Sequence, residues 1–340
     1  MITVLIASPL EPAEVARIAA FGPERVRVVH EPDLLGRPRY VADHHGTPPD
    51  LTEDDLARWR SLLRGADVLF DFDWFEPGQM PRNAPHLRWV QATSAGIGEF
   101  IQSAGLENSG ITFTTAAGVH AIPLSEFVIL GLLYITKNVP WLKEQQAGHA
   151  WQRYTSEQLA GKRVLVIGLG NVGRETALKC ARMGIEVLGM SATAHEPPEG
   201  VTRLVKRHEL LDVLPGIDAL ILSVPHTSDT YHLIGQKELA ALPRTAVLVN
   251  VSRGSVVDEP ELVAALRQGR LAGAALDVFE HEPLPADNPL WDMPNVLISP
   301  HSASTVADEN HRIVDLFIDN LGRYLDGRPL RNVFVASRGY

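Results

Sequence analysis

Three side chains in this sequence could together bind a carboxylate and move a proton: Arg253, Glu282 and His301. Arg253 stands between a strongly apolar run and Gly254, a poor position for a solvated charge but a good one for gripping a carboxylate through two parallel hydrogen bonds. His301 follows another apolar run and a proline, and Glu282 lies in a proline-bounded loop, residues 279–285. On residue chemistry alone, each of the three fits a structural role as well as a catalytic one.

A second feature that could take part in chemistry is a glycine-rich stretch, residues 164–173. Four apolar residues run into Gly168, Gly170 and Gly173, spaced Gly-x-Gly-x-x-Gly, and a helical pattern covers residues 174–183. The order strand, glycine turn, helix places free backbone N–H groups at a helix N-terminus, where they can bind phosphates. We therefore predict a dinucleotide site that includes Asn171 and Val172. The alternative is a glycine-rich turn that binds nothing.

Further apolar runs predict strands at residues 186–190, 219–224, 246–251, 273–279 and 296–299. Polar residues follow several of them, and the carboxyl ends of parallel strands meet at one edge of a sheet. The candidate cofactor contacts at this edge are Ser191, Val224, Pro225, His226, Thr230, Val251 and Ser252, and Asp277 lies near the end of another of these strands.

Residues 1–117 also alternate strand and helix patterns, with strands predicted at 2–7, 25–30, 66–72 and 87–93. Trp74 and the segment Ser94, Ala95 and Gly96 follow two of these strands and are candidates to contact substrate. For Trp74 a packing role is an equal alternative, and the glycine turn either offers N–H groups to a carboxylate or is only a turn. We expect a surface loop, not a metal site, at His44 and His45, because no further ligand stands at a suitable spacing.

Two helices are predicted to frame this first region. Thr52 and Asp55 form a capping box that opens a helix. A helical pattern over residues 305–325, with Thr305 and Asp308 as a capping pair, is expected to return the chain to the first domain.

The length of 340 residues favours two domains. A net charge of −10 argues against nucleic acid or an anionic membrane as partner. Cys180 is the only cysteine, so no intrachain disulfide is possible, and we expect it to be a buried apolar residue. The amino terminus lacks the pattern of a secretion signal, and we expect a cytoplasmic protein.

Three segments resemble the D-isomer-specific 2-hydroxyacid dehydrogenase family. They are residues 250–259 (NVSRGSVVDE), residues 273–285 (GAALDVFEHEPLP), and residues 289–296 leading to Ser299-Pro300-His301. The resemblance covers most of residues 161–303, whereas the first region is similar only at residues 94–96 and 117–126. Within the family, the chain is most similar to glyoxylate and hydroxypyruvate reductases.

The resemblance implies an α/β protein of two Rossmann-like, doubly wound parallel-sheet domains, with the active site in the cleft between them. A discontinuous, flavodoxin-like substrate domain would comprise residues 1–118 and 305–340, and residues 119–304 would bind the dinucleotide. It also implies a homodimer and no requirement for a metal.

The implied reaction transfers a hydride between NAD(P)H and a small 2-keto acid such as glyoxylate or hydroxypyruvate, giving the D-2-hydroxy acid. Arg253 would bind the carboxylate and polarise the keto oxygen, His301 would act as general acid, and Glu282 would orient and charge the imidazole. Asp277 would lie near the nicotinamide, and the backbone at Ala95 and Gly96 would bind the carboxylate from its other side. Alternatives are phosphoglycerate, a phosphonate or a bulkier keto acid as substrate, or a nucleotide-sensing protein without turnover.

The choice between NAD and NADP depends on the residue after the second nucleotide-domain strand. An acidic residue there usually binds the ribose hydroxyls of NAD, but this chain has Ser191, so nothing repels a 2′-phosphate. The arginine expected in NADP-binding relatives is also missing, being Ala192, although Arg174, Arg203 or His195 could replace it. The pattern favours NADP by a small margin.

Overall fold

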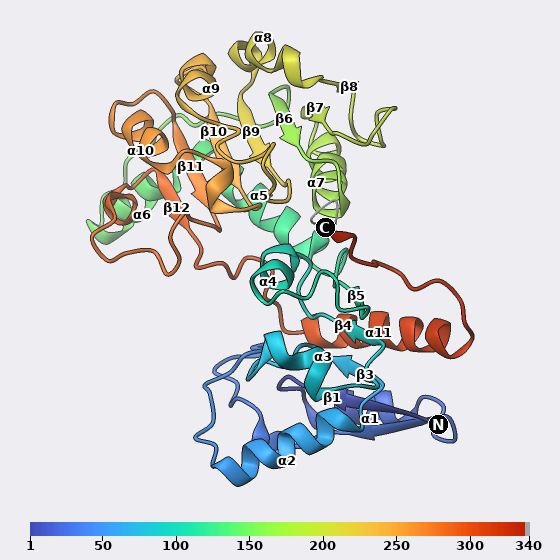
Figure 1. The fold of residues 1–340 in the computed structure, drawn as a ribbon. Helices are drawn as coiled ribbons and strands as arrows, with labels where there is room; N and C mark the ends of the chain where they lie inside the picture. The colour runs from blue at the N-terminus through green and yellow to red at the C-terminus, as the bar shows by residue number, and fades with distance from the viewer. Residues whose placement is uncertain (337–340) are drawn as a thin grey trace. The chain divides into compact units, whose positions relative to one another are not determined.

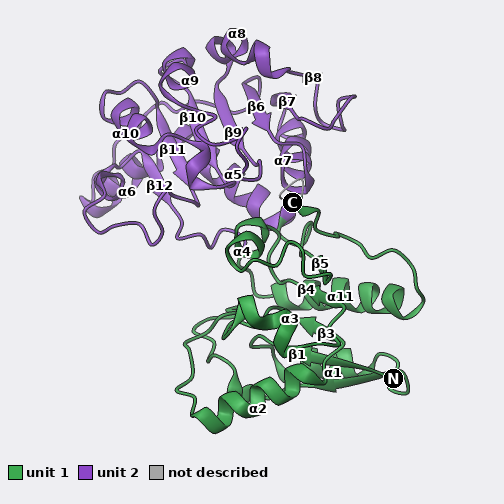
Figure 2. Ribbon diagram, viewed as in Figure 1, with its two compact units in different colours: residues 1–120, 305–340 green, residues 121–304 purple. Residues whose placement is uncertain are grey.

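The computed structural model describes residues 1–336 and divides the chain into two compact units (Figures 1 and 2). Unit 1 comprises residues 1–120 and 305–340, and unit 2 comprises residues 121–304. The boundaries predicted from the sequence lie at 118/119 and 304/305. Each unit is built on its own parallel sheet, five strands in unit 1 and seven in unit 2, so the predicted α/β class is confirmed.

The sheet of unit 1 has the strand order β2-β1-β3-β4-β5, which is the order of flavodoxin-like folds. All of its strand pairs are parallel. The strand β5 was not predicted, because Thr112-Phe113-Thr114 is too short and too polar to give an apolar run. The strands are β1 (Ile2–Ile6), β2 (Val26–Val29), β3 (Val68–Phe70), β4 (Trp89–Gln91) and β5 (Thr112–Thr114).

Helices cover both faces of this sheet. They are α1 (Pro12–Ala20), α2 (Glu53–Arg64), α3 (Met80–Asn83), α4 (Gly98–Ser103) and α11 (Glu309–Leu325), with 3₁₀ turns η1 (Pro32–Leu34) and η2 (Pro77–Gln79). The predicted capping box of α2 is confirmed, since the Thr52 hydroxyl accepts from the Asp55 N–H and the Asp55 carboxylate accepts from the Thr52 N–H.

The predicted start of the last helix is wrong. α11 begins at Glu309, and Asp308 at its N-cap makes no side-chain capping bond. The Asp308 carboxylate is instead hydrogen bonded to the Arg312 guanidinium, four residues on, and residues 305–308 lie outside the helix. The helix packs on the sheet through Phe317, whose ring centroid lies 5.2 Å from those of Phe70 and Trp89.

The sheet of unit 2 has the order β12-β11-β10-β9-β6-β7-β8, and all of its pairs are parallel. Numbered within the unit, this is the doubly wound dinucleotide-binding order 3-2-1-4-5-6 with a seventh strand added. The short β8 was not predicted. The strands are β6 (Arg163–Ile167), β7 (Glu186–Met190), β8 (Arg203–Leu204), β9 (Ala219–Leu222), β10 (Val247–Asn250), β11 (Gly273–Leu276) and β12 (Val296–Ile298).

The helices of unit 2 are α5 (Ala121–Thr136), α6 (Val139–Ala147), α7 (Asn171–Arg182), α8 (Leu210–Val213), α9 (Gln236–Ala241) and α10 (Glu259–Arg267). The 3₁₀ turns are η3 (Arg207–Glu209), η4 (Leu214–Gly216), η5 (Gly254–Val256) and η6 (Pro289–Asp292). Helix α5 packs closely on β11, because a Cβ added at Gly131 would lie 2.4 Å from the Cβ of Ala275. In the described part of the chain, no single helix combines the length and apolarity needed to cross a bilayer, and α5 with α6 meets those criteria only as a pair bent by 63°.

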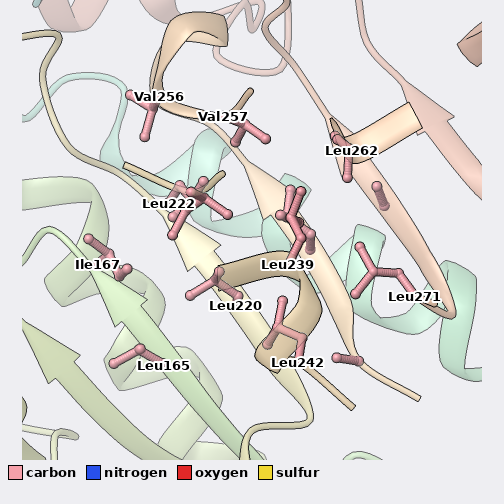
Figure 3. Close-up of a cluster of buried hydrophobic side chains, with 14 of the residues drawn as sticks. Leu165, Ile167, Leu220, Leu222, Leu239, Leu242, Val256, Val257, Leu262 and Leu271 are labelled. Carbon is pink, nitrogen blue, oxygen red and sulfur yellow. The ribbon is translucent and has the colours of Figure 1, made fainter. Parts of the chain in front are cut away.

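Alternate residues of each central strand enter opposite cores, which is why the strands read as continuous apolar runs. Leu165 and Ile167 of β6 join a cluster with Leu220 and Leu222 of β9 and residues of α9 and α10 (Figure 3). The intervening β6 residues, Val164 and Val166, pack on the other face with α5 and α7. Cys180 belongs to this second cluster and is buried, as predicted, and burial raises its thiol pKa to about 12.

The expected loop at His44 and His45 is present and His45 is exposed, but the His44 side chain is only 11% exposed and enters a buried polar cluster in unit 1. The Asp43 carboxylate accepts from the backbone and guanidinium of Arg39 and from the Gly46 N–H, which turns the loop. His44 Nε2 therefore lies 3.4 Å from Glu309 Oε1, and His120 Nε2 lies 3.2 Å from the same oxygen. The cluster connects the last residue of the first segment of unit 1 with the first residue of α11.

The electrostatics of this cluster favour an ionised Glu309. Burial alone would raise the pKa of Glu309, but the hydrogen bonds and charges of His120 and His44 outweigh it and lower the pKa to about 2. Because the folded pKa lies below the ordinary value of 4.5, this group stabilises the fold above about pH 4.5. The stabilisation is lost as the pH falls towards 2.

We predict that Glu309→Gln removes part of the acid sensitivity of unit 1. Between pH 5 and pH 3 the wild-type chain should lose on the order of 2 kcal/mol of unfolding free energy that the variant does not lose. Denaturant unfolding at the two pH values measures this difference. The control is Glu24→Gln, which changes the same charge at an exposed site. Equal acid sensitivity in wild type and Glu309→Gln would contradict the assignment.

Candidate active site

The register of three adjacent strands in unit 2 sets the positions of Arg253 and His301. Asn250 of β10 is paired with Leu276 of β11, which is paired with Ile298 of β12. Arg253 and His301 each lie three residues beyond this row, on strands separated only by β11. Since neighbouring strands are about 4.8 Å apart, the two backbones are separated by about 10 Å at the carboxyl edge of the sheet. Both side chains can therefore reach a small molecule bound over the end of β11.

His301 is held by Glu282. His301 Nδ1 lies 2.7 Å from Glu282 Oε2, and Glu282 Oε1 accepts a hydrogen bond from the Phe279 N–H at 3.0 Å. His301 has φ = +53°, an uncommon backbone conformation for a residue other than glycine. Its N–H is hydrogen bonded to the Asp277 carbonyl at 2.9 Å. Such strained residues are concentrated at functional sites.

The charges of this pair stabilise each other. The hydrogen bond to Glu282 raises the pKa of His301, although burial and the nearby Arg253 act in the opposite direction. Burial would raise the pKa of Glu282, but hydrogen bonds from His301 and Phe279, together with the charges of His301 and Arg253, lower it below its ordinary value. An imidazolium with a second, outward N–H is the form that can donate a proton to a bound oxygen.

Asn250, which sequence reasoning missed, fixes the loop that carries Arg253. Its side-chain amide donates to the Arg253 carbonyl at 3.0 Å, and its oxygen accepts from the N–H and hydroxyl of Ser252. Gly254 then packs on the next loop so closely that an added Cβ would lie 1.9 Å from the Phe279 carbonyl. The sequence signal that could have identified Asn250 is a polar side chain at the end of a buried strand. This packing brings the loop of Arg253 against the loop of Glu282.

Asp277 is buried, and one carboxylate oxygen is occupied by the turn that presents His301. Oδ1 accepts from the Ser299 hydroxyl at 2.6 Å, the Ser302 N–H at 3.0 Å and the Ala303 N–H at 2.9 Å. Burial raises the pKa of Asp277 despite these donors. Asp277 thus positions the turn around His301, and its predicted location beside the nicotinamide stays a prediction.

The glycine turn has the geometry of a phosphate cradle. Gly168 has φ = +96°, and a Cβ there would lie 2.4 Å from the Ser223 carbonyl oxygen. A Cβ on Gly173 would lie 1.8 Å from the Gly168 carbonyl oxygen, whereas a Cβ on Gly170 would meet nothing within 4 Å. The helix begins at Asn171, three residues earlier than predicted, so the N–H groups of Asn171 and Val172 lie in its first turn. These residues fit a bound pyrophosphate.

The remaining predicted cofactor residues lie on the same edge. Thr230 folds the loop after β9, since its hydroxyl donates to the Pro225 carbonyl at 2.7 Å, and His226 Nδ1 lies 2.7 Å from the Ser255 hydroxyl. Val224 precedes this loop, and Val251 and Ser252 follow β10. The Ser191 hydroxyl accepts from the N–H groups of Thr193 and Ala194, at 3.2 and 3.1 Å. The position of the usual acid is therefore occupied by an uncharged turn.

Two of the three basic residues predicted as possible contacts of a 2′-phosphate have partners within the protein. Arg174 donates through Nε to the Leu169 carbonyl at 2.9 Å, and Arg203 lies 3.4 Å from Glu209. His195 is exposed in the loop after β7.

In unit 1, Trp74 and Ser94-Ala95-Gly96 follow the adjacent strands β3 and β4. Asp71, fully buried with φ = +69°, connects the two strand ends, accepting from Trp74 Nε1 at 3.1 Å and from the Thr93 N–H at 3.4 Å. Trp74 is 36% exposed, and the His45 ring lies edge-on to it with centroids 4.2 Å apart. The N–H groups of residues 94–96 donate to no acceptor within residues 1–336. This segment can bind an anion.

Within residues 1–336, no group of three or more His, Cys, Asp or Glu side chains is arranged to hold a metal ion. At the edge of the second sheet the structure brings together Arg253, Glu282 and His301.

Known proteins are similar to this chain in sequence and in fold. Residues 129–303 match the sequence model of the family described as D-isomer specific 2-hydroxyacid dehydrogenase, NAD binding domain. A glyoxylate/hydroxypyruvate reductase B of Yersinia pestis is 34% identical over 290 residues, which are 83% of this chain and 88% of the relative.

Two solved structures extend the similarity to nearly the whole chain. A D-isomer specific 2-hydroxyacid dehydrogenase of Xanthobacter autotrophicus, in complex with NADPH and MES, has a TM-score of 0.79 and 28% identity and covers 99% of both chains. An NADPH-dependent glyoxylate/hydroxypyruvate reductase of Sinorhizobium meliloti, in complex with NADP and sulfate, has a TM-score of 0.79 and 25% identity and covers both chains fully.

The two glycines at the start of α7 should respond differently to alanine. Gly173→Ala should lower the melting temperature of the protein without ligand, because its Cβ meets backbone that cannot move away. Gly170→Ala should leave that melting temperature within about 2 °C of wild type, since the Cβ enters open space, yet weaken NADP⁺ binding at least tenfold by obstructing the pyrophosphate. Calorimetry and thermal melts measure both effects. Unchanged NADP⁺ affinity in Gly170→Ala would contradict the cradle.

Proposed function

The chain belongs to the D-isomer-specific 2-hydroxyacid dehydrogenase family, and from this premise we propose that it reduces glyoxylate and hydroxypyruvate with NADPH to the corresponding 2-hydroxy acids. The family establishes NAD(P)H-dependent reduction of a 2-keto acid. The choice of substrate and coenzyme is our proposal. The observation that carries the mechanism is the 2.7 Å contact between His301 and Glu282. The charge of Arg253 is near enough to affect the pKa of His301.

The residues of unit 2 supply binding and proton transfer. We propose that Arg253 binds the substrate carboxylate through its planar fork and places a positive charge near the keto oxygen. His301, charged through its contact with Glu282, donates the proton from Nε2 to that oxygen as it becomes negative. In the reverse direction the neutral imidazole accepts the proton. With the pyrophosphate of the coenzyme bound in the glycine cradle, the reduced nicotinamide would supply the hydride.

Unit 1 contributes a second anion-binding element to the proposal. The N–H groups of Ala95 and Gly96 would bind a substrate carboxylate, and Trp74 would contact the substrate. What supports this is that these N–H groups have no acceptor within the described residues and that Asp71 fixes both strand ends.

The proposal of NADPH is supported by the region after β7. A turn closed by the Ser191 hydroxyl carries no charge that would repel a 2′-phosphate, and the similar Xanthobacter and Sinorhizobium proteins are complexes with NADPH and NADP. We also propose a cytoplasmic homodimer. The single, buried Cys180 is compatible with a reducing compartment.

Substitutions at Arg253 and His301 should affect different kinetic constants. Arg253→Ala should raise KM for glyoxylate about 100-fold or more, because two charge-assisted hydrogen bonds are lost. His301→Ala should lower kcat by about 10² to 10⁴ with KM changed by only a few-fold. Steady-state assays of NADPH and NADH oxidation with glyoxylate and hydroxypyruvate measure both effects. In the same assays, the wild-type protein should have a higher kcat/KM with NADPH than with NADH. Near-normal kcat in His301→Ala would overturn its role.

Removal of the carboxylate at Glu282 should change the pH profile. Glu282 raises the pKa of His301, so this pKa should be lower in Glu282→Gln. The variant should therefore keep reductase activity at acidic pH, and as the pH rises its activity should fall earlier than that of wild type. The control is Glu280→Gln, since Glu280 lies 2.5 Å from His232 and not beside His301. Rates of keto-acid reduction between about pH 5 and 9 measure the shift. Superimposable profiles for wild type and Glu282→Gln would count against the pairing.

A further inference from the structure

Unit 1 contains a basic cavity that the proposed reaction does not use. The cavity, about 530 Å³ in volume, lies where α2, η2 and α3 meet. Its lining residues are Arg60, Arg64, Glu76, Gln79, Arg82 and Asn83. None of these belongs to unit 2 or to the Ala95-Gly96 segment. Three arginines face one cavity in a chain whose net charge is −10.

The single carboxylate in this arginine cavity is already used. Glu76 accepts from Arg60 at two positions, Nε at 2.9 Å and Nη2 at 2.8 Å, and from the Asn83 side-chain amide at 2.9 Å. The hydrogen bond with Arg60 lowers the pKa of Glu76, so the carboxylate is held ionised. This contact makes Arg60 and Glu76 a neutral, rigid wall.

The other two arginines have no hydrogen-bonded partner in the described part of the chain, although the charge of Arg82 also acts on the Glu76 carboxylate. Within residues 1–336, the side chains of Arg64 and Arg82 form no hydrogen bond and no ion pair, unlike that of Arg60. Arg64 follows Arg60 by four residues on α2, so both side chains lie on one helix face. The dipole at the end of α2 favours a cation at Arg64, and Arg82 comes from the last turn of α3, a second element that lines the same cavity.

We propose that the arginine cavity binds a small phosphorylated molecule, separately from the catalytic reaction. Planar guanidinium groups recognise phosphate oxygens in pairs, and a phosphate ester carries the two negative charges that match Arg64 and Arg82. A volume of about 530 Å³ is within the range of small-molecule sites and leaves room for the organic part of such an ester. The site would serve to bind an effector or a product of another reaction that transfers phosphate.

Calorimetric titration of inorganic pyrophosphate tests this proposal without measuring turnover. The protein is first saturated with NADP⁺ and oxamate, so that the glycine cradle and Arg253 are occupied, in magnesium-free buffer of low ionic strength. Wild type should show one saturable site whose affinity falls as NaCl is added. Arg64→Gln/Arg82→Gln should bind pyrophosphate at least tenfold more weakly, with a melting temperature within about 3 °C of wild type because both substitutions are at exposed positions.

The matched control is Arg244→Gln/Arg267→Gln, which removes two exposed arginines from unit 2 and should leave pyrophosphate affinity unchanged. Absence of saturable binding in wild type, or equal affinity in Arg64→Gln/Arg82→Gln, would overturn the proposal. Citrate that binds as tightly as pyrophosphate would overturn the assignment to phosphate. Each result is independent of whether glyoxylate is reduced, so failure of this site and failure of the proposed function are distinguishable.

Discussion

The parallel register of β10, β11 and β12 is the constraint on which the site depends. Because Asn250, Leu276 and Ile298 lie in one row, residues far apart in sequence leave the sheet at the same edge. Arg253 and His301 stand at equal distances beyond that row, and Asp277 on the middle strand holds the turn of His301 by three hydrogen bonds. If one of these strands shifted by one residue, all of its own side chains would turn to the other face of the sheet. The Arg253 guanidinium and the His301 imidazole would then be separated.

Upon this scaffold, electrostatics sets the chemical state of the pair. Glu282 is fixed by the Phe279 N–H on one oxygen and contacts His301 through the other, so orientation and charge are determined together. The uncommon backbone conformation of His301 is maintained because its N–H is bonded to the Asp277 carbonyl. Burial and the charge of Arg253 both oppose the charging of His301, and the Glu282 carboxylate outweighs them. The same positive charge, however, is what attracts an anionic substrate.

The sequence predicted the α/β class, most strands and the strand-end positions, because buried parallel strands are recognisable as apolar runs. It missed β5 and β8, which are too short to form such runs, and it began α11 at Thr305 although the Asp308 side chain is bonded to Arg312. It predicted a surface loop at His44 and His45, but it could not show that the folded loop around Asp43 turns the His44 imidazole towards Glu309. Asn250 and the arginine cavity also depend on tertiary contacts. Local sequence patterns do not encode such contacts.

The most direct test of this account is the titration of His301 itself by NMR in protein labelled with ¹³C at the histidine Cε1 positions. The His301 signal is assigned by its absence from the spectrum of His301→Gln. The account predicts that the imidazole of the wild-type protein titrates above the ordinary histidine value of 6.5, because Glu282 stabilises its charged form. A His301 that titrates at or below 6.5 would contradict the claim that Glu282 keeps this side chain ready to donate its proton.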